Sequence, residues 1–142
     1  MTEGPPKPPH TAAEWEAAIR AEDIARLDAM LAGGYDVNAR DRYSQTALMR
    51  AAHGGRSRSV AWLVAHGAEL DHAAKFGLSA LMLAAFSGNH EIVRILAEAG
   101  ADVSRVGSGA PGFAGKTAAD LAEERGDTET AALLRKLDGP RG

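Results

Sequence analysis

The sequence predicts an all-α fold, a solenoid in which four helix–turn–helix units stack and are joined by short hairpin-like loops. The first observation is a repeat: residues 46–52 (TALMRAA) match residues 79–85 (SALMLAA), 33 positions further on. The second is that Gly34, Gly67 and Gly100 recur at the same interval of 33. The third is that apolar residues in each unit are spaced to line one face of a short helix. Because one helix pair cannot bury its apolar face alone, the pairs are expected to stack.

The first two units open the stack. In the first, about residues 10–40, Thr11 is expected to take the N-cap, with Glu14 reaching back to it in a capping box. The exposed face of this unit is acidic, as suits the end of a solenoid. In the second, about residues 41–73, Gly55 is expected to end the first helix, because glycine adopts the left-handed conformation at little cost.

The last two units close the stack. In the third, about residues 74–106, Ile92, Val93, Ile95 and Leu96 line one face of the second helix. Trp62 aligns with Ile95 of this helix and is therefore predicted to lie in the core. In the fourth, about residues 107–138, charged residues make the far end polar, so the stack has a cap at each end.

One interval departs from the period. Ser79 and Thr117 begin equivalent helices but lie 38 residues apart, so five extra residues separate the third and fourth units. These fall in residues 106–114 (VGSGAPGFA), a glycine-rich stretch that we expect to be flexible. The insertion therefore predicts a lengthened loop at the tip between these two units.

Composition and charge exclude several classes of function. Residues 1–9 are expected to be a flexible proline-rich leader without the apolar h-region of a secretory signal, and residues 139–142 a tail. No stretch approaches the roughly 20 apolar residues that span a membrane, so we expect a cytoplasmic protein. The absence of cysteine excludes disulfides and thiol chemistry, and the net charge of −3 argues against nucleic-acid binding. Arginine outnumbers lysine, which favours a GC-rich bacterial source.

The repeated phrases resemble the ankyrin family. The third unit carries the resemblance most clearly, with GLSAL at residues 77–81, GNHEIV at 88–93 and GADV at 100–103. The resemblance covers about residues 8–138. It departs from the family where proline is replaced by alanine, and where the usual histidine is replaced by Met49, Met82 and Asp120. We expect these changes to remove the hydrogen bond of that histidine and to lower stability without changing the fold.

The resemblance implies a non-catalytic protein-binding module that uses its turn tips and the concave face of its first helices. Arg42 and Tyr43 at the second tip match Lys75 and Phe76 at the third, which puts a cation beside an aromatic residue at one period. Either these rings bind the partner or they fold over the neighbouring tip. The residues expected to contact the partner are Arg40, Arg42, Tyr43, Gln45, Arg50, His53, Lys75, Phe76, Leu78, Met82, Phe86 and Phe113.

Cations gather in the middle units and acids at both ends, so the expected partner has an acidic surface with an apolar spot. Whether binding would inhibit or recruit that partner stays open, as does a role as an accessory subunit. We expect the free protein to be a monomer. A structural homo-oligomer, in which one tip edge meets its copy, is an alternative.

A nucleotide-binding function is a second alternative. Residues 110–117 (APGFAGKT) fit a relaxed phosphate-loop pattern, in which Lys116 would contact a terminal phosphate and Thr117 a magnesium ion. The hydrophobic strand that should precede such a loop is missing from the sequence, and Pro111 would remove one amide from the cradle. The histidines at 10, 53, 66, 72 and 90 show no metal-ligand spacing. We therefore predict no catalytic residue, cofactor or metal site.

Overall fold

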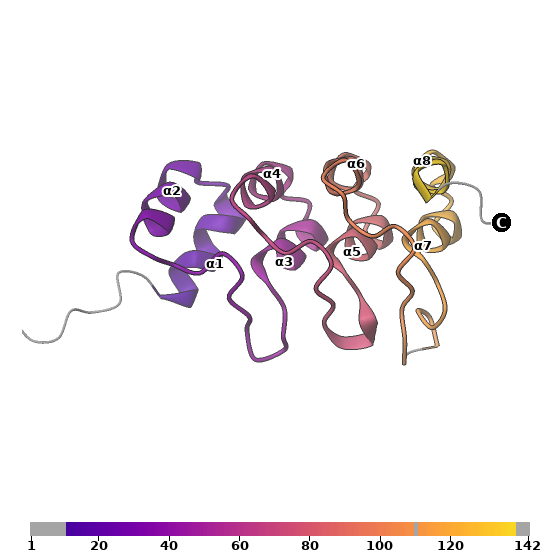
Figure 1. The fold of residues 1–142 in the computed structure, drawn as a ribbon, viewed down its shortest axis with the longest axis horizontal. Coiled ribbons are helices and arrows are strands. Elements are labelled where there is room, and N and C mark those ends of the chain that lie inside the picture. The colour runs from indigo at the N-terminus through magenta and orange to yellow at the C-terminus, as the bar shows by residue number, and fades with distance from the viewer. Residues whose placement is uncertain (1–10, 110, 139–142) are drawn as a thin grey trace, which may run out of the picture.

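The computed structural model describes residues 11–109 and 111–138, which form four consecutive helix–turn–helix units (Figure 1). The helices are α1 (Ala12–Ala21), α2 (Ile24–Ala32), α3 (Ala47–Gly54), α4 (Ser57–Ala65), α5 (Ala80–Phe86), α6 (His90–Glu98), α7 (Ala118–Glu124) and α8 (Thr128–Asp138), with a short 3₁₀ turn, η1 (Lys75–Gly77). The predicted leader, His10, Ala110 and the predicted tail lie outside the described residues. Among the described helices, none is long and apolar enough to cross a membrane.

The helices form two layers (Figure 1). The first helices of the units, α1, α3, α5 and α7, lie in one row, and the second helices, α2, α4, α6 and α8, lie in the other. Each first helix packs on the next one along the stack. Their buried faces are mainly alanine, as at Ala47, Ala51 and Ala84, and such small side chains allow close approach. The loops between units project from the first-helix row.

Hydroxyl caps fix where the first helices begin. Thr46, Ser79 and Thr117 are the N-caps of α3, α5 and α7, and their side-chain oxygens accept backbone N–H groups at 3.2–3.3 Å. Thr11 caps α1 in the same way, accepting from the Glu14 N–H at 3.1 Å. Each cap satisfies a helix donor that otherwise lacks a partner, which is worth about 1 kcal/mol.

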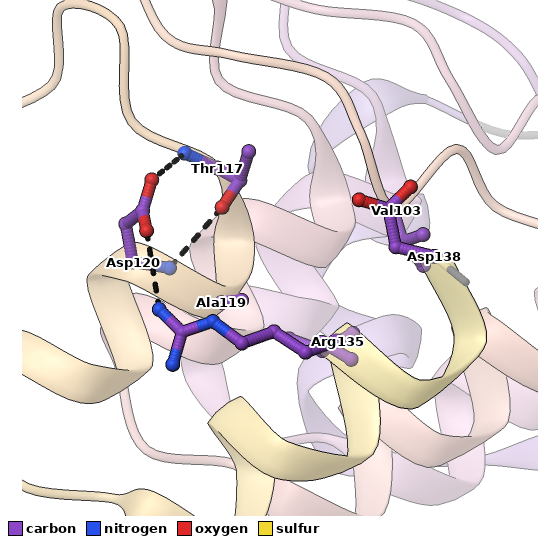
Figure 2. Close-up of a pocket in the computed structure, with 7 residues that line it drawn as sticks. Val103, Thr117, Ala119, Asp120, Arg135 and Asp138 are labelled. Atoms are coloured by element: carbon purple, nitrogen blue, oxygen red, sulfur yellow. Dashed lines mark hydrogen bonds and ion pairs between the residues drawn. The ribbon is translucent and has the colours of Figure 1, made fainter. Parts of the chain in front are cut away.

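At the fourth unit Asp120 stands at the position of the family's histidine. Its carboxylate makes a hydrogen bond of its own, accepting from the Thr117 N–H at 3.0 Å, and completes a capping box. Figure 2 shows this pair in a hollow at the end of the stack, where Arg135 of α8 donates to Asp120 at 3.3 Å. Arg135 also donates to Glu123. The hydrogen bond from Thr117 and the charge of Arg135 hold the pKa of Asp120 below its ordinary value.

The core runs along the whole stack between the two helix layers. Leu27, Leu63 and Leu96 of the second helices have no exposed surface. Burying each such side chain contributes roughly 1.5–3 kcal/mol. Trp62 is 6% exposed, which confirms its prediction as a core residue, and its indole N–H donates to Asp28 at 2.8 Å.

Hydrogen bonds from side chains to backbone carbonyls link neighbouring units. The Ser59 hydroxyl donates to the Ile19 carbonyl at 2.6 Å, which joins the second unit to the first. The Asn89 amide donates to the Ala52 carbonyl at 3.2 Å, which joins the third unit to the second. These bonds satisfy carbonyls at the ends of the first helices, so they help to hold the units in register.

Candidate partner-binding site

The second tip, which joins the first and second units, is organised by Asp41. Its carboxylate accepts from the Tyr43 and Gln45 N–H groups at 2.8 and 3.0 Å, and from Arg50 of α3 at 2.9 Å. Burial raises the pKa of Asp41, but these hydrogen bonds and the Arg50 charge outweigh it, so the pKa lies below the ordinary value. A tip held by so many bonds presents Tyr43 from a fixed backbone.

Tyr43 projects from this tip into solvent. Its side chain is 64% exposed, more than any other large apolar or aromatic residue of the described chain. The Arg42 guanidinium lies over the ring, 5.3 Å from its centroid. This exposure favours the alternative in which the Tyr43 ring is free to contact a partner over the one in which it folds onto the neighbouring tip.

The third tip carries the matching pair. The Lys75 ammonium lies 4.9 Å from the centroid of the Phe76 ring, as Arg42 does over Tyr43. Phe76 is 36% exposed and has a φ of 65°, in the left-handed region that favours glycine. This backbone is uncommon for a bulky residue. It is held in part by the Ser108 N–H, which donates to the Phe76 carbonyl at 2.7 Å.

The long loop folds back against the third tip. The Gly107 N–H donates to the Lys116 carbonyl at 2.9 Å, and the Gly115 N–H donates to the Gly107 carbonyl at 3.0 Å. Gly107 and Ala114 also form an isolated parallel bridge. The loop is therefore closed at its base by backbone hydrogen bonds.

Loop closure brings three aromatic rings together. Phe113 stacks against Phe76 with centroids 6.1 Å apart, and it meets Phe86 of α5 edge to face at 5.5 Å. Phe86 stays 46% exposed, while Phe113 is partly buried. Such pairs add about 0.5–1.5 kcal/mol beyond their buried area. Phe76 therefore does fold onto its neighbour, but it keeps an exposed edge beside Phe86.

Two predicted contact residues are not at the surface. Leu78 is 9% exposed and Met82 is 1% exposed, and both belong to the core. Leu78 directly precedes the buried cap Ser79, so its side chain turns inward with the start of α5. Met82 lies where α5 packs between α3 and α7, as Met49 does on α3. Their placement in the contact set was wrong.

The remaining predicted contact residues differ in their exposure and in the partners they already have. Arg40 forms an ion pair with Glu69 at 3.4 Å, and Gln45 is half-buried at the base of the second tip. Arg50 anchors that tip through Asp41. His53 is exposed near the end of α3.

The structure does not support the phosphate-loop alternative. Lys116 is paired with Glu124, with 2.6 Å between Nζ and Oε1, and Thr117 is occupied as the N-cap of α7. Within the described ranges no strand precedes the loop. The lysine and threonine that would hold phosphate and magnesium thus have structural partners already.

The described histidines have protein partners or lie exposed. His66 stacks on Trp62 at 4.3 Å, and His72 lies 2.7 Å from the Ser44 carbonyl. His90 contacts the buried Thr130 hydroxyl at 2.7 Å. No group of three or more metal-ligating side chains occurs in the part of the chain that the structure describes.

A family profile described as ankyrin repeats (3 copies) matches residues 15–107. The chain belongs to the ankyrin repeat family. Ankyrin repeats are generally protein–protein interaction modules, and the family is typically not enzymatic. The match ends where the long loop begins, but α7 and α8 continue the stack beyond it as a fourth ankyrin-like helix pair. No curated protein matches the chain.

Residue-by-residue sequence reasoning missed two groups that shape this ankyrin surface. Asp41 orders the second tip by accepting from the N–H groups two and four residues later. An aspartate at the start of a turn is the sequence signal of such an Asx turn. Arg125 donates to the Phe86 carbonyl at 3.3 Å, across the boundary between the third and fourth units. Nothing local in the sequence indicates this second contact, because 39 residues separate its partners.

Proposed function

We propose that this ankyrin repeat protein is a non-catalytic binding module that holds a partner protein along its tip edge. The tip edge comprises the two cation–aromatic pairs of the second and third tips with the two phenylalanines beside them: Arg42, Tyr43, Lys75, Phe76, Phe86 and Phe113. The observation that carries the proposal is exposure, because Tyr43, Phe76 and Phe86 are 64%, 36% and 46% exposed. Exposed aromatic residues gathered on one edge are typical of protein-binding surfaces.

Charge supports an acidic partner with an apolar spot. Arg42 and Lys75 lie over aromatic rings, and within the described residues neither forms an ion pair. An acidic surface would meet both cations while its apolar spot covers the exposed rings beside them. The same proposal places the protein in the cytoplasm as a regulator or accessory subunit, which fractionation of cells carrying the native gene checks.

Affinity capture from the native lysate tests the tip edge. Tyr43→Ala removes the most exposed ring, and Leu137→Ala removes a large apolar side chain, 49% exposed on α8, as a control. Removing a hot-spot residue costs about 2 kcal/mol or more, a loss of at least tenfold in affinity. We expect Tyr43→Ala to reduce capture by this factor, with Tyr43→Ala/Phe76→Ala lower still, and Leu137→Ala to leave it unchanged.

Full capture by the double variant, with unchanged melting, would show that the partner binds elsewhere. Light scattering over a range of concentrations separates the homo-oligomer. A mass that rises with concentration in the wild type, but not in Tyr43→Ala, would identify the partner as a second copy of the chain.

A further inference from the structure

A second hollow lies between the first and second units, away from the tips. It has a volume of about 190 Å³ and is walled by the C-terminal parts of α1 and α3. Its floor is apolar, with Ile19 and Ala51 exposed by only 3% and 1%. Three arginines and one carboxylate also line it: Arg20, Arg50, Arg56 and Glu16.

Two of these arginines carry an unused donor. The Nε atoms of Arg50 and Arg56 are buried and have no hydrogen-bond partner. A buried donor without an acceptor is unfavourable, so each guanidinium gains when its side chain turns to meet an acceptor in the hollow.

The local charge sets the kind of acceptor. Arg20 lies 3.9 Å from Glu16, and Arg50 is paired with Asp41 at 2.9 Å. Arg56 forms no ion pair with any described residue, so the hollow has about one positive charge to spare. A carboxylate with a single charge and two acceptor oxygens fits this balance better than a doubly charged phosphate. The apolar floor accepts an aliphatic side chain next to that carboxylate.

We propose that the hollow between α1 and α3 binds an aspartate or glutamate side chain of the partner, with a neighbouring aliphatic residue on its floor. This inference rests on the proposed function and adds a second contact to it, at a site separate from the tip edge. The occupant is an acidic segment of a partner protein.

Peptide titration followed by the arginine Nε–H resonances in NMR spectra of the full chain tests this site. The probe is Ac-Gly-Glu-Leu-Glu-Gly-NH2, and its isostere Ac-Gly-Gln-Leu-Gln-Gly-NH2 lacks the side-chain charge. We expect the acidic peptide to shift the Arg50 and Arg56 Nε–H signals saturably, and the isostere to leave them in place. The glutamine peptide with a free C-terminal carboxylate should also leave them in place, which separates the side chain from a chain terminus.

Matched variants assign the effect to the hollow. Arg56→Gln should lower the affinity for the acidic peptide by about tenfold or more, because a charge-assisted hydrogen bond is lost. Arg94→Gln removes an exposed arginine of α6 and should change nothing.

Three results would overturn the proposal: no shift with the acidic peptide, equal shifts with its isostere, or equal weakening by both variants. The wild-type titration requires no variant to fold. Such a failure, with capture still lost in Tyr43→Ala, would reject this hollow and leave the tip edge standing.

Discussion

Replacing Gly107 by alanine tests whether the long loop is held against the third tip. A Cβ at this position would lie 2.5 Å from the Phe113 carbonyl oxygen and 3.1 Å from its carbonyl carbon. Backbone atoms cannot swing aside as the end of a flexible side chain can, so the loop has to move. Gly112→Ala is the control, because a Cβ there meets no atom within 4 Å and Gly112 has no positive φ.

The expected magnitude follows from the bonds at the base of the loop. Moving the loop breaks the Gly107–Lys116 and Gly115–Gly107 hydrogen bonds, at 2.9 and 3.0 Å. Each is worth about 0.5–1.5 kcal/mol net, so the free energy of unfolding should fall by about 1–3 kcal/mol. At about 3 °C per kcal/mol, this lowers Tm by about 3–9 °C. Gly112→Ala should stay within about 0.5 kcal/mol of the wild type.

Calorimetry gives the change in Tm, and hydrogen exchange shows where it arises. The Gly115 amide, which donates across the base of the loop, should exchange faster in Gly107→Ala than in Gly112→Ala. Equal melting and equal exchange in the two variants would show that these hydrogen bonds do not close the loop.

Three further predictions concern the core, the helix caps and the nucleotide-binding alternative. Leu63→Ala should cost about 2–5 kcal/mol because Leu63 has no exposed surface, whereas Leu137→Ala, at a 49% exposed position, should be nearly neutral in urea unfolding. Asp127 accepts from the Thr130 hydroxyl at 2.6 Å, which lowers its pKa as Thr117 lowers that of Asp120. The stabilisation from these two carboxylates is complete above about pH 4 and is lost as pH falls through their folded pKa values. Tm should therefore drop below pH 4, and less steeply in Asp120→Asn. ATP with magnesium should not raise Tm, since Lys116 is already paired with Glu124; a saturable rise would revive the nucleotide alternative.

The repeat and its helices could be predicted from sequence because they depend on local pattern. Thr46, Ser79 and Thr117 mark the starts of equivalent helices, and all three are N-caps in the structure. The same pattern does not say which way a side chain faces at a tip. Leu78 and Met82 were placed among the contact residues by their position in the repeat, yet the start of α5 directs both side chains into the core.

The loop could be located but not described from sequence. Its five extra residues and glycines predicted a flexible, lengthened loop, but they did not indicate the backbone pairing from Gly107 to Lys116 that closes its base. That pairing depends on the third tip, where the Phe76 carbonyl accepts from Ser108 across the boundary between units. Contacts between segments this far apart leave no periodic trace.

Site-specific photo-crosslinking in cells tests most directly whether the tip edge is the binding surface. A photoreactive phenylalanine analogue replaces Tyr43 or Phe86 on the tip edge, or Ala65 or Leu137, which are exposed on the second helices. We predict that one protein crosslinks from the two tip-edge positions and from neither of the other two. Crosslinks of equal or greater yield from the second helices would contradict the proposed function.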